Sequence, residues 1–190
     1  MRLAIFGGTF DPIHNAHLAA AREAAAAYRL DQVWFVPAER PPHKAGITHA
    51  PYEDRYRMVE LACQGEPKFT ASRLEQGPLS SYSIDTIEKV RARLDPADEL
   101  FFLIGADAFA EIQTWRRWRE VIRAVEFIVV SRPGHWYAVP EGARVDRLES
   151  LDLPVSSSEI RRRLALGEDR VEAPAPVLTY IRERGLYRSI

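Results

Sequence analysis

Short apolar runs alternate along the chain with longer segments in which apolar positions recur at helical spacing. Runs of β-branched and aromatic residues predict strands at Leu3–Phe6, Val33–Val36, Phe69–Leu74, Leu100–Ile104 and Phe127–Val130. Several of these runs are apolar at every position, which is typical of strands covered on both faces. Apolar spacings of three and four predict helices over residues 16–28, 52–63 and 84–94. Strands that alternate with helices predict an α/β fold with a doubly wound parallel sheet and right-handed crossovers.

The carboxyl-terminal third of the chain has a different, helical pattern. The segment Ser156–Glu159 has the spacing of a capping box, and apolar positions follow until Gly167 ends the predicted helix. Two prolines then precede a last helix, Val177–Arg184, which is followed by a glycine. We expect residues 1–190 to form one domain, a Rossmann-like doubly wound sheet with a C-terminal helical subdomain from about 155 to 190.

Composition narrows the class of protein further. The 190 residues are 46% apolar and 28% charged, the balance of a globular protein, and a net charge of −1 argues against a strongly basic nucleic-acid binder. No apolar run reaches the ~18–20 residues of a membrane span, and no signal peptide is recognisable. The single cysteine, Cys63, excludes an intrachain disulfide and lies in a helical pattern as a small buried residue. These features predict a cytoplasmic protein without membrane or nucleic-acid partners.

The most informative segment of the chain follows the first predicted strand. Gly7 and Gly8 predict a tight turn whose bare amides can approach phosphate oxygens. His14 and His17 lie one helical turn apart where the next helix begins, near the positive end of its dipole. Both imidazoles could donate N–H groups to a triphosphate and to the charge that develops as a phosphoryl bond breaks. The segment predicts an enzyme that acts on a nucleoside triphosphate, whereas incidental histidines after a glycine turn are the less favoured interpretation.

Two segments in the middle of the chain carry polar side chains with two interpretations each. Lys44 follows a stretch rich in proline, and it is either a phosphate ligand or a solvated surface lysine. Ser83 and Asp85 open a predicted helix and are either substrate ligands or simple helix caps. The residue types alone favour a solvated lysine at position 44, and they do not decide between a ligand and a cap for Ser83 and Asp85.

Two more candidate segments follow later strands. Asp107 comes just past a predicted strand, where a carboxylate is well placed to hold ribose hydroxyls, and Trp115 offers a flat face to an aromatic ring. Trp118, three residues further on, is better explained as a core residue. The serines at 156–158 and Arg161 form a plausible triphosphate clamp, with a capping box and a solvated arginine face as the alternative.

These segments together resemble a known family. Gly-Gly-Thr-Phe-Asp-Pro-Ile-His-x-x-His, from Gly7 to His17, resembles the His-x-Gly-His signature of the adenylyl- and cytidylyltransferases, with Ala16 in place of the usual glycine. Pro-Pro-His-Lys at 41–44, Ser-Tyr-Ser-Ile-Asp-Thr at 81–86, Ile-Gly-Ala-Asp ahead of Thr-Trp, and Val-Ser-Ser-Ser-Glu-Ile-Arg at 155–161 are similar to segments of the nicotinate-nucleotide adenylyltransferases.

The resemblance implies transfer of the adenylyl group of ATP to nicotinate mononucleotide. We expect Mg²⁺ to bridge the triphosphate and keep several waters, since no carboxylate cluster in the sequence suggests a dedicated metal site. It implies catalytic roles for His14 and His17. The ATP-binding residues that it implies are Gly7, Gly8, Thr9, Phe10, His14, His17, Lys44, Ser157, Ser158 and Arg161. Those implied for the mononucleotide are Lys44, Tyr82, Ser83, Asp107, Trp115 and Arg132.

Two other functions stay open at this point. A pantetheine-phosphate adenylyltransferase shares the first motif, although Trp115 and the segments at 41–44 and 81–86 speak against it. A nucleotide-binding sensor without catalytic activity is less favoured, because both histidines, Lys44 and Arg161 are present. A homo-oligomer is compatible with either function.

Overall fold

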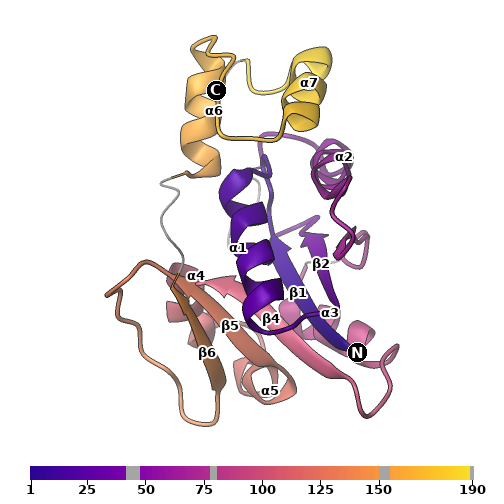
Figure 1. Cartoon of the computed structure of the whole chain (residues 1–190), viewed down its shortest axis with the longest axis vertical. Coiled ribbons are helices and arrows are strands. Elements are labelled where there is room, and N and C mark those ends of the chain that lie inside the picture. The colour runs from indigo at the N-terminus through magenta and orange to yellow at the C-terminus, as the bar shows by residue number, and fades with distance from the viewer. Residues whose placement is uncertain (42–47, 78–80, 150–154, 189–190) are drawn as a thin grey trace.

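One parallel sheet forms the centre of the molecule (Figure 1). The computed structural model describes residues 1–41, 48–77, 81–149 and 155–188. The strands are β1 (Arg2–Gly8), β2 (Gln32–Pro37), β3 (Phe69–Ala71), β4 (Glu99–Gly105), β5 (Glu126–Ser131) and β6 (Arg144–Glu149). They lie in the order β3-β2-β1-β4-β5-β6, and every neighbouring pair is parallel. This is the strand order of a doubly wound Rossmann-like sheet, so the predicted fold class is confirmed.

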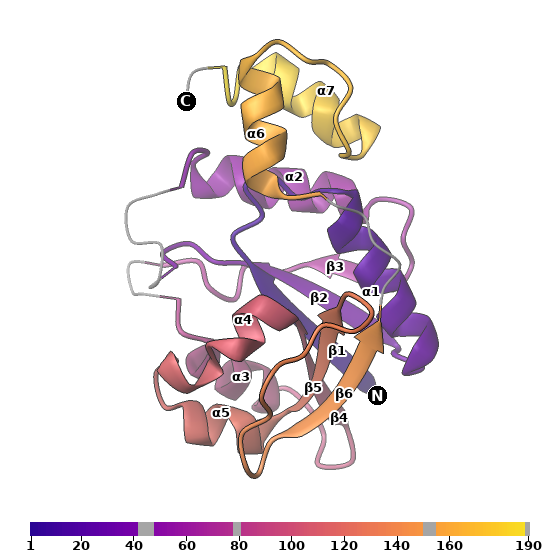
Figure 2. The same cartoon turned by 90° about the vertical axis from the view of Figure 1, so that its left-hand side faces the viewer.

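Helices cover both faces of the sheet, as Figure 2 shows in a view along its edge. One face packs against α1 (Asn15–Ala27) and α2 (Tyr52–Cys63), and α7 (Ala175–Arg184) packs against α2 in the same core cluster. The other face packs against α3 (Ser83–Arg91), α4 (Ala106–Ala110) and α5 (Trp118–Ala124). Neighbouring residues of β4 show why its run is apolar throughout, since Phe101 belongs to the first core cluster and Phe102 to the second. Within the described residues no helix has the length and apolar character needed to cross a membrane.

The first strand is longer than its apolar run. Gly7 and Gly8 are the last residues of β1 and lie opposite Val36 and Pro37 of β2, so the expected glycine turn at this point is wrong. The chain turns after them, and Phe10 adopts a left-handed backbone with φ of 48° while its ring is buried. The strand continues through the glycines because its pairing with β2 continues. A Cβ atom on Gly8 would lie 3.0 Å from the Phe10 ring, so glycine is needed there to make room for that ring.

The elements that the apolar pattern did not predict lie in the second half of the chain. β6 carries charged residues and is paired only with β5, at the edge of the sheet, so it has no need of a continuous apolar run. The short helix α4, the 3₁₀ turn Ile112–Thr114 and α5 occupy the stretch between β4 and β5. Helix α6 (Ser157–Ala165), in contrast, was predicted. It begins where the capping box places it, with the Glu159 amide donating to Ser156 Oγ at 3.2 Å.

Candidate active site

A cavity of about 530 Å³ opens at the carboxyl ends of β4 and β5, beside the start of α1. Ala16 lines it from the helix, and Asp107, Arg132 and His135 line it from the segments that follow the two strands. The sheet order reverses between β1 and β4, and ligands of doubly wound folds bind at such a reversal. The sheet therefore brings Ala16 of the first motif together with the candidate residues Asp107 and Arg132 from later in the chain.

His14 and His17 stand at the start of α1 as a stacked pair. His14 is the N-cap residue, the two ring centroids lie 3.7 Å apart, and the ring planes differ by 23°. The backbone N–H of His14 donates to Nδ1 of His17 at 3.2 Å. An Nδ1 that accepts a hydrogen bond leaves the proton of a neutral imidazole on Nε2. His17 is therefore set to donate Nε2–H to a bound anion.

Both imidazoles are neutral near pH 7 in the free protein. Burial lowers the pKa of His14 to about 4, and burial together with the neighbouring His14 holds the pKa of His17 well below its ordinary value. Nδ1 of His14 is buried and has no hydrogen-bond partner among the described residues. A buried polar atom left in this state is costly, and a bound ligand that pairs with it would remove that cost. The pair can thus stabilise a phosphate as hydrogen-bond donors without carrying permanent charge.

The C-terminal helical part holds the loop between β1 and α1. Ser157 Oγ donates to the carbonyl of Pro12 at 2.9 Å, and Arg161 Nη1 donates to the carbonyl of Asp11 at 2.7 Å. Ser158 is exposed, and its hydroxyl lies 3.2 Å from that of Ser156. The structure therefore brings Ser157 and Arg161 to the first motif, where both have structural partners, whereas the contact printed for Ser158 lies within its own segment.

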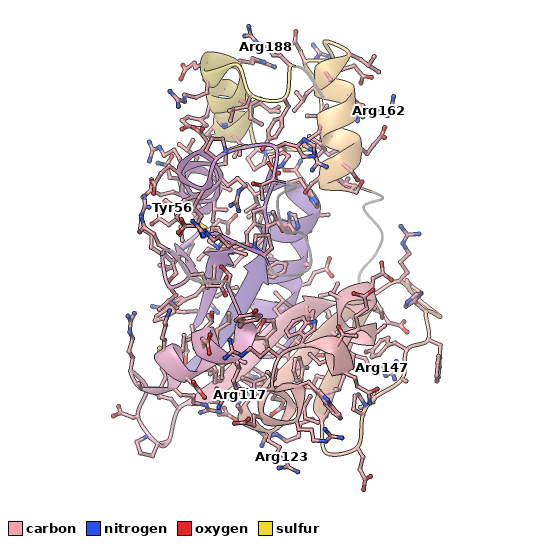
Figure 3. All side chains as sticks on the ribbon, turned by 180° about the vertical axis from the view of Figure 1, so that it is seen from behind. Tyr56, Arg117, Arg123, Arg147, Arg162 and Arg188 are labelled. Atoms are coloured by element: carbon pink, nitrogen blue, oxygen red, sulfur yellow. The ribbon has the colours of Figure 1, made fainter. Side chains whose placement is uncertain are left out.

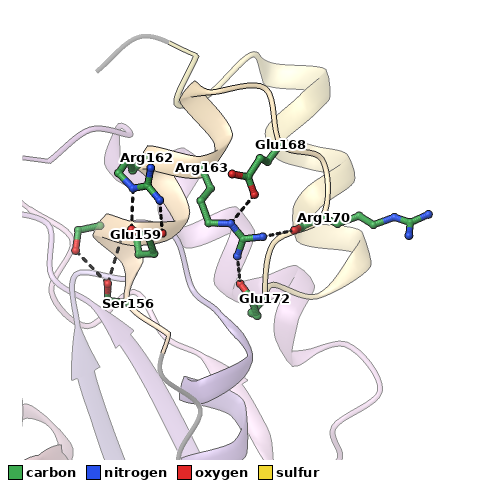
Figure 4. A network of polar contacts seen from close by, with 8 residues as sticks. Ser156, Glu159, Arg162, Arg163, Glu168, Arg170 and Glu172 are labelled. Carbon is green, nitrogen blue, oxygen red and sulfur yellow. Dashed lines mark hydrogen bonds and ion pairs between the residues drawn. The ribbon is translucent and has the colours of Figure 1, made fainter.

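The other arginines of α6 face away from this loop. Figure 4 shows Arg162 paired with Glu159 at 2.6 Å, and Arg163 paired with Glu168 at 2.6 Å and Glu172 at 2.7 Å. All of these partners belong to the C-terminal part itself. Arg161 is consequently the arginine of this run that reaches the first motif.

The predicted mononucleotide residues Tyr82 and Ser83 lie at the start of α3. Tyr82 is the N-cap residue and Ser83 the first residue of the helix, and no side chain caps the helix. Ser83 is thus not the cap of this helix, and its role as a ligand stays a prediction. Ser81 Oγ accepts hydrogen bonds from the amides of Glu39 at 3.1 Å and Arg40 at 3.2 Å, which ties this helix start to the segment after β2. Lys44 lies further along that segment, outside the described residues.

Trp115 packs near the end of β1, and its neighbour Arg116 reaches the start of α3. Its ring packs edge-on against Phe102 at 5.9 Å between centroids, and a Cβ atom on Gly7 would lie 3.5 Å from the end of the Phe102 ring. The next residue, Arg116, places its guanidinium over the Tyr82 ring at 4.7 Å. Trp115 is half-buried, so part of its surface remains accessible.

The neighbouring residues of this segment have structural roles. Trp118 packs partly against the second core cluster, as the sequence predicts. Arg117, labelled in Figure 3, pairs with Glu88 of α3 at 2.7 Å and with Glu120 of α5 at 2.6 Å. These pairs fix the two helices that flank Trp115 relative to each other.

Arg55 is a site residue that the sequence did not reveal. It is 1% exposed, and its guanidinium donates to the carbonyls of Thr9 and Ala38 at 2.7 Å each and of Ala50 at 3.2 Å. It therefore joins the loop of the first motif to the segments that follow β2 and precede α2. A signal was available, because Arg55 occupies the buried side of α2 that Met58 also occupies, where an unpaired cation is unexpected.

Cys63 and the metal-ligating residue types are further candidates for chemistry at the site. Cys63 is the last residue of α2, and burial raises the pKa of its thiol to about 12, which fits the prediction that it is not a nucleophile. Among the residues that the structure describes, no cluster of three or more His, Cys, Asp or Glu side chains could hold a metal ion.

The fold and the histidine pair at the start of α1 define a nucleotidyltransferase. Residues 5–163 match the family model described as Cytidylyltransferase-like. The chain is 65% identical to a probable nicotinate-nucleotide adenylyltransferase of Solibacter usitatus (strain Ellin6076), over 98% of this chain and 100% of the relative. It is 46% identical to a probable nicotinate-nucleotide adenylyltransferase of Thermus thermophilus, over 99% of this chain and 100% of the relative. The chain belongs to the cytidylyltransferase-like family and, within it, to the nicotinate-nucleotide adenylyltransferases.

Solved structures agree on the fold. Plasmodium falciparum nicotinic acid mononucleotide adenylyltransferase, complexed with NaAD, superimposes with a TM-score of 0.78 at 20% identity and covers 98% of this chain and 97% of its own. The same protein complexed with APC gives a TM-score of 0.76. At this identity the likeness concerns the fold alone.

Proposed function

We propose that this protein transfers the adenylyl group of ATP to nicotinate mononucleotide, giving deamido-NAD and diphosphate. A phosphate oxygen of the mononucleotide attacks the α-phosphorus of ATP in line, and the bond from that phosphorus to the diphosphate breaks. The attacking phosphate is already anionic, so orientation and charge stabilisation can supply most of the rate acceleration. The observation that carries the proposal is the neutral stacked pair of His14 and His17 at the start of α1, with Nε2–H of His17 available to the α-phosphate.

The cavity beside α1 fits the adenosine part of ATP. It shares the start of α1 with the histidine pair, so a nucleoside in it would present its triphosphate to His14 and His17. Asp107 and Arg132 lie in this cavity, apart from the Tyr82, Ser83 and Trp115 group with which the sequence placed them. We therefore assign the Asp107 carboxylate to the ribose of ATP.

The second substrate is assigned to the start of α3. Tyr82 and Ser83 offer a helix start without a side-chain cap, which suits the carboxylate of a pyridine ring, and Trp115 offers a face for that ring. Lys44, Ser157, Ser158 and Arg161 remain predicted phosphate ligands, and Thr9 and Phe10 shape the loop between the glycines and the histidines. Mg²⁺ enters with ATP as part of the substrate, because this ion binds through the phosphate oxygens and keeps several of its waters, so it needs no dedicated protein site.

The test is diphosphate release with MgATP and three acceptors: nicotinate mononucleotide, nicotinamide mononucleotide and phosphopantetheine. A strong preference for nicotinate mononucleotide supports the proposal. A preference for phosphopantetheine keeps the transferase class and refutes the pyridine assignment, and no release with any acceptor leaves a nucleotide-binding sensor. Asp107→Asn, assayed beside the wild type, is expected to raise the KM for ATP more than the KM for the mononucleotide.

A further inference from the structure

The carboxylate of Asp11 is a buried junction between three separate segments. Asp11 is 3% exposed, and its Oδ2 accepts the amide of His49 at 2.7 Å. Its Oδ1 accepts the amide of Ala50 at 3.1 Å and the hydroxyl of Tyr187 at 2.7 Å. The first two donors come from the segment that leads into α2, and the third comes from the far end of the chain. Asp11 therefore fixes the loop between β1 and α1 against two other parts of the molecule.

Tyr187 is held firmly enough to act as an orienting group. It follows the end of α7 in a left-handed backbone with φ of 62°, and it is 6% exposed within the core cluster that also contains α1 and α2. Burial and the nearby Asp11 raise the pKa of its hydroxyl, so the group remains a protonated donor at any working pH. A fixed ring with a protonated hydroxyl gives the carboxylate one preferred orientation.

Asp11 is placed to transmit that orientation to the reacting groups. It precedes His14 by three residues, and its own backbone carbonyl accepts Arg161 Nη1. The backbone of His14 in turn donates to Nδ1 of His17, so a shift of the loop moves the bond that sets the His17 tautomer. The chain of contacts runs from Tyr187 to Asp11, from Asp11 to the loop, and from the loop to the histidine pair.

We propose that Tyr187 is a positioning residue for adenylyl transfer, because its hydroxyl orients the Asp11 carboxylate and thereby the loop that presents His14 and His17. The proposal rests on the proposed function for its kinetic consequence. It gives the C-terminal segment after α7 a part in catalysis without contact with either substrate.

The chain offers a matched control in Tyr180. Its hydroxyl donates to Asp54 Oδ1 at 2.7 Å, so it also ties the C-terminal part to a buried carboxylate of the same face. Asp54 lies on α2 and not in the loop of the first motif. Tyr180→Phe and Tyr187→Phe thus remove the same chemical bond of the same length, and only the second removes it from the loop.

The test measures diphosphate release and histidine NMR spectra for the wild type and both variants. We expect Tyr187→Phe to lower kcat about 10-fold with less than about a 2-fold change in the KM for ATP, whereas Tyr180→Phe keeps both values. In samples labelled with ¹⁵N-histidine, we expect the His14 and His17 signals to shift in Tyr187→Phe alone. Wild-type kcat and unchanged histidine signals in Tyr187→Phe would overturn the proposal, and so would equal losses in both variants.

A second variant and the activity of the wild type complete the test. Should Tyr187→Phe fail to fold, it is combined with Asp11→Asn, which removes the buried charge left without its donor. Asp11→Asn alone keeps an Oδ1 that accepts the Tyr187 hydroxyl, so equal kcat values in the single and the double variant overturn the proposal. A wild type that releases no diphosphate refutes the proposed function instead, and the histidine spectra then decide whether Tyr187 positions the pair.

Discussion

Replacement of Arg55 by methionine tests whether one buried cation holds the loops of the site together. The two carbonyls at 2.7 Å, those of Thr9 and Ala38, would lose a charged donor, and a buried acceptor left unsatisfied costs about 1–3 kcal/mol. The two losses sum to about 4 kcal/mol of unfolding free energy, a large part of the ~5–15 kcal/mol that stabilises a typical domain. Burial lowers the pKa of Arg55, and relief of that desolvation offsets part of the loss.

The measurement is urea unfolding followed by circular dichroism at 25 °C. Arg57→Met serves as the control, because Arg57 lies on the same helix, is exposed, and has a surface ion pair with Glu60. We expect that variant to stay within about 0.5 kcal/mol of the wild type. Arg55→Lys should fall between the two, since an ammonium group lacks the planar fork that reaches both carbonyls. A loss below about 1 kcal/mol in Arg55→Met would show that the loops hold their positions without the arginine.

Three further predictions concern the first motif. His17→Ala is expected to lower kcat about 10²–10³-fold in steady-state kinetics, while calorimetry should show little change in the affinity for the mononucleotide. Equal losses in kcat and in that affinity would contradict the role of His17 at the α-phosphate. Gly8→Ala should destabilise the free protein by about 1–3 kcal/mol, because its Cβ would meet the Phe10 ring at 3.0 Å, whereas Gly7→Ala, with its nearest contact at 3.5 Å, should leave thermal stability unchanged. The pKa of His14 is lowered to about 4, so the unfolded chain binds a proton that the folded one does not between pH 6.5 and 4, and stability falls as the pH drops through that window. In urea unfolding, we expect the unfolding free energy of His14→Gln to fall by about 3 kcal/mol less than that of the wild type as the pH drops through this window. An identical pH dependence of the two proteins would refute the assignment.

The sequence by itself determined the class of fold and the placement of the two histidines at one helix start, because both depend on local patterns. A strand buried on both faces must be apolar throughout, so β4 and β5 could be predicted from their continuous apolar runs alone. The spacing of His14 and His17 places them at the start of one helix, whatever packs around it. The serine cap at Ser156 is likewise local, since donor and acceptor are three residues apart.

Only the tertiary structure decided which distant groups act together and in which protonation state. Tyr187 meets Asp11 across 176 positions of the chain, and no local pattern specifies such a contact. In the sequence, Arg55 is one of several charged residues on a helix. Only the folded chain brings it the carbonyl partners, which come from three other segments. The apolar pattern did not predict β6, because a strand at the edge of a sheet needs few apolar residues. The neutral state of His14 follows from burial by its neighbours, and burial is a property of the packed molecule that its sequence does not state.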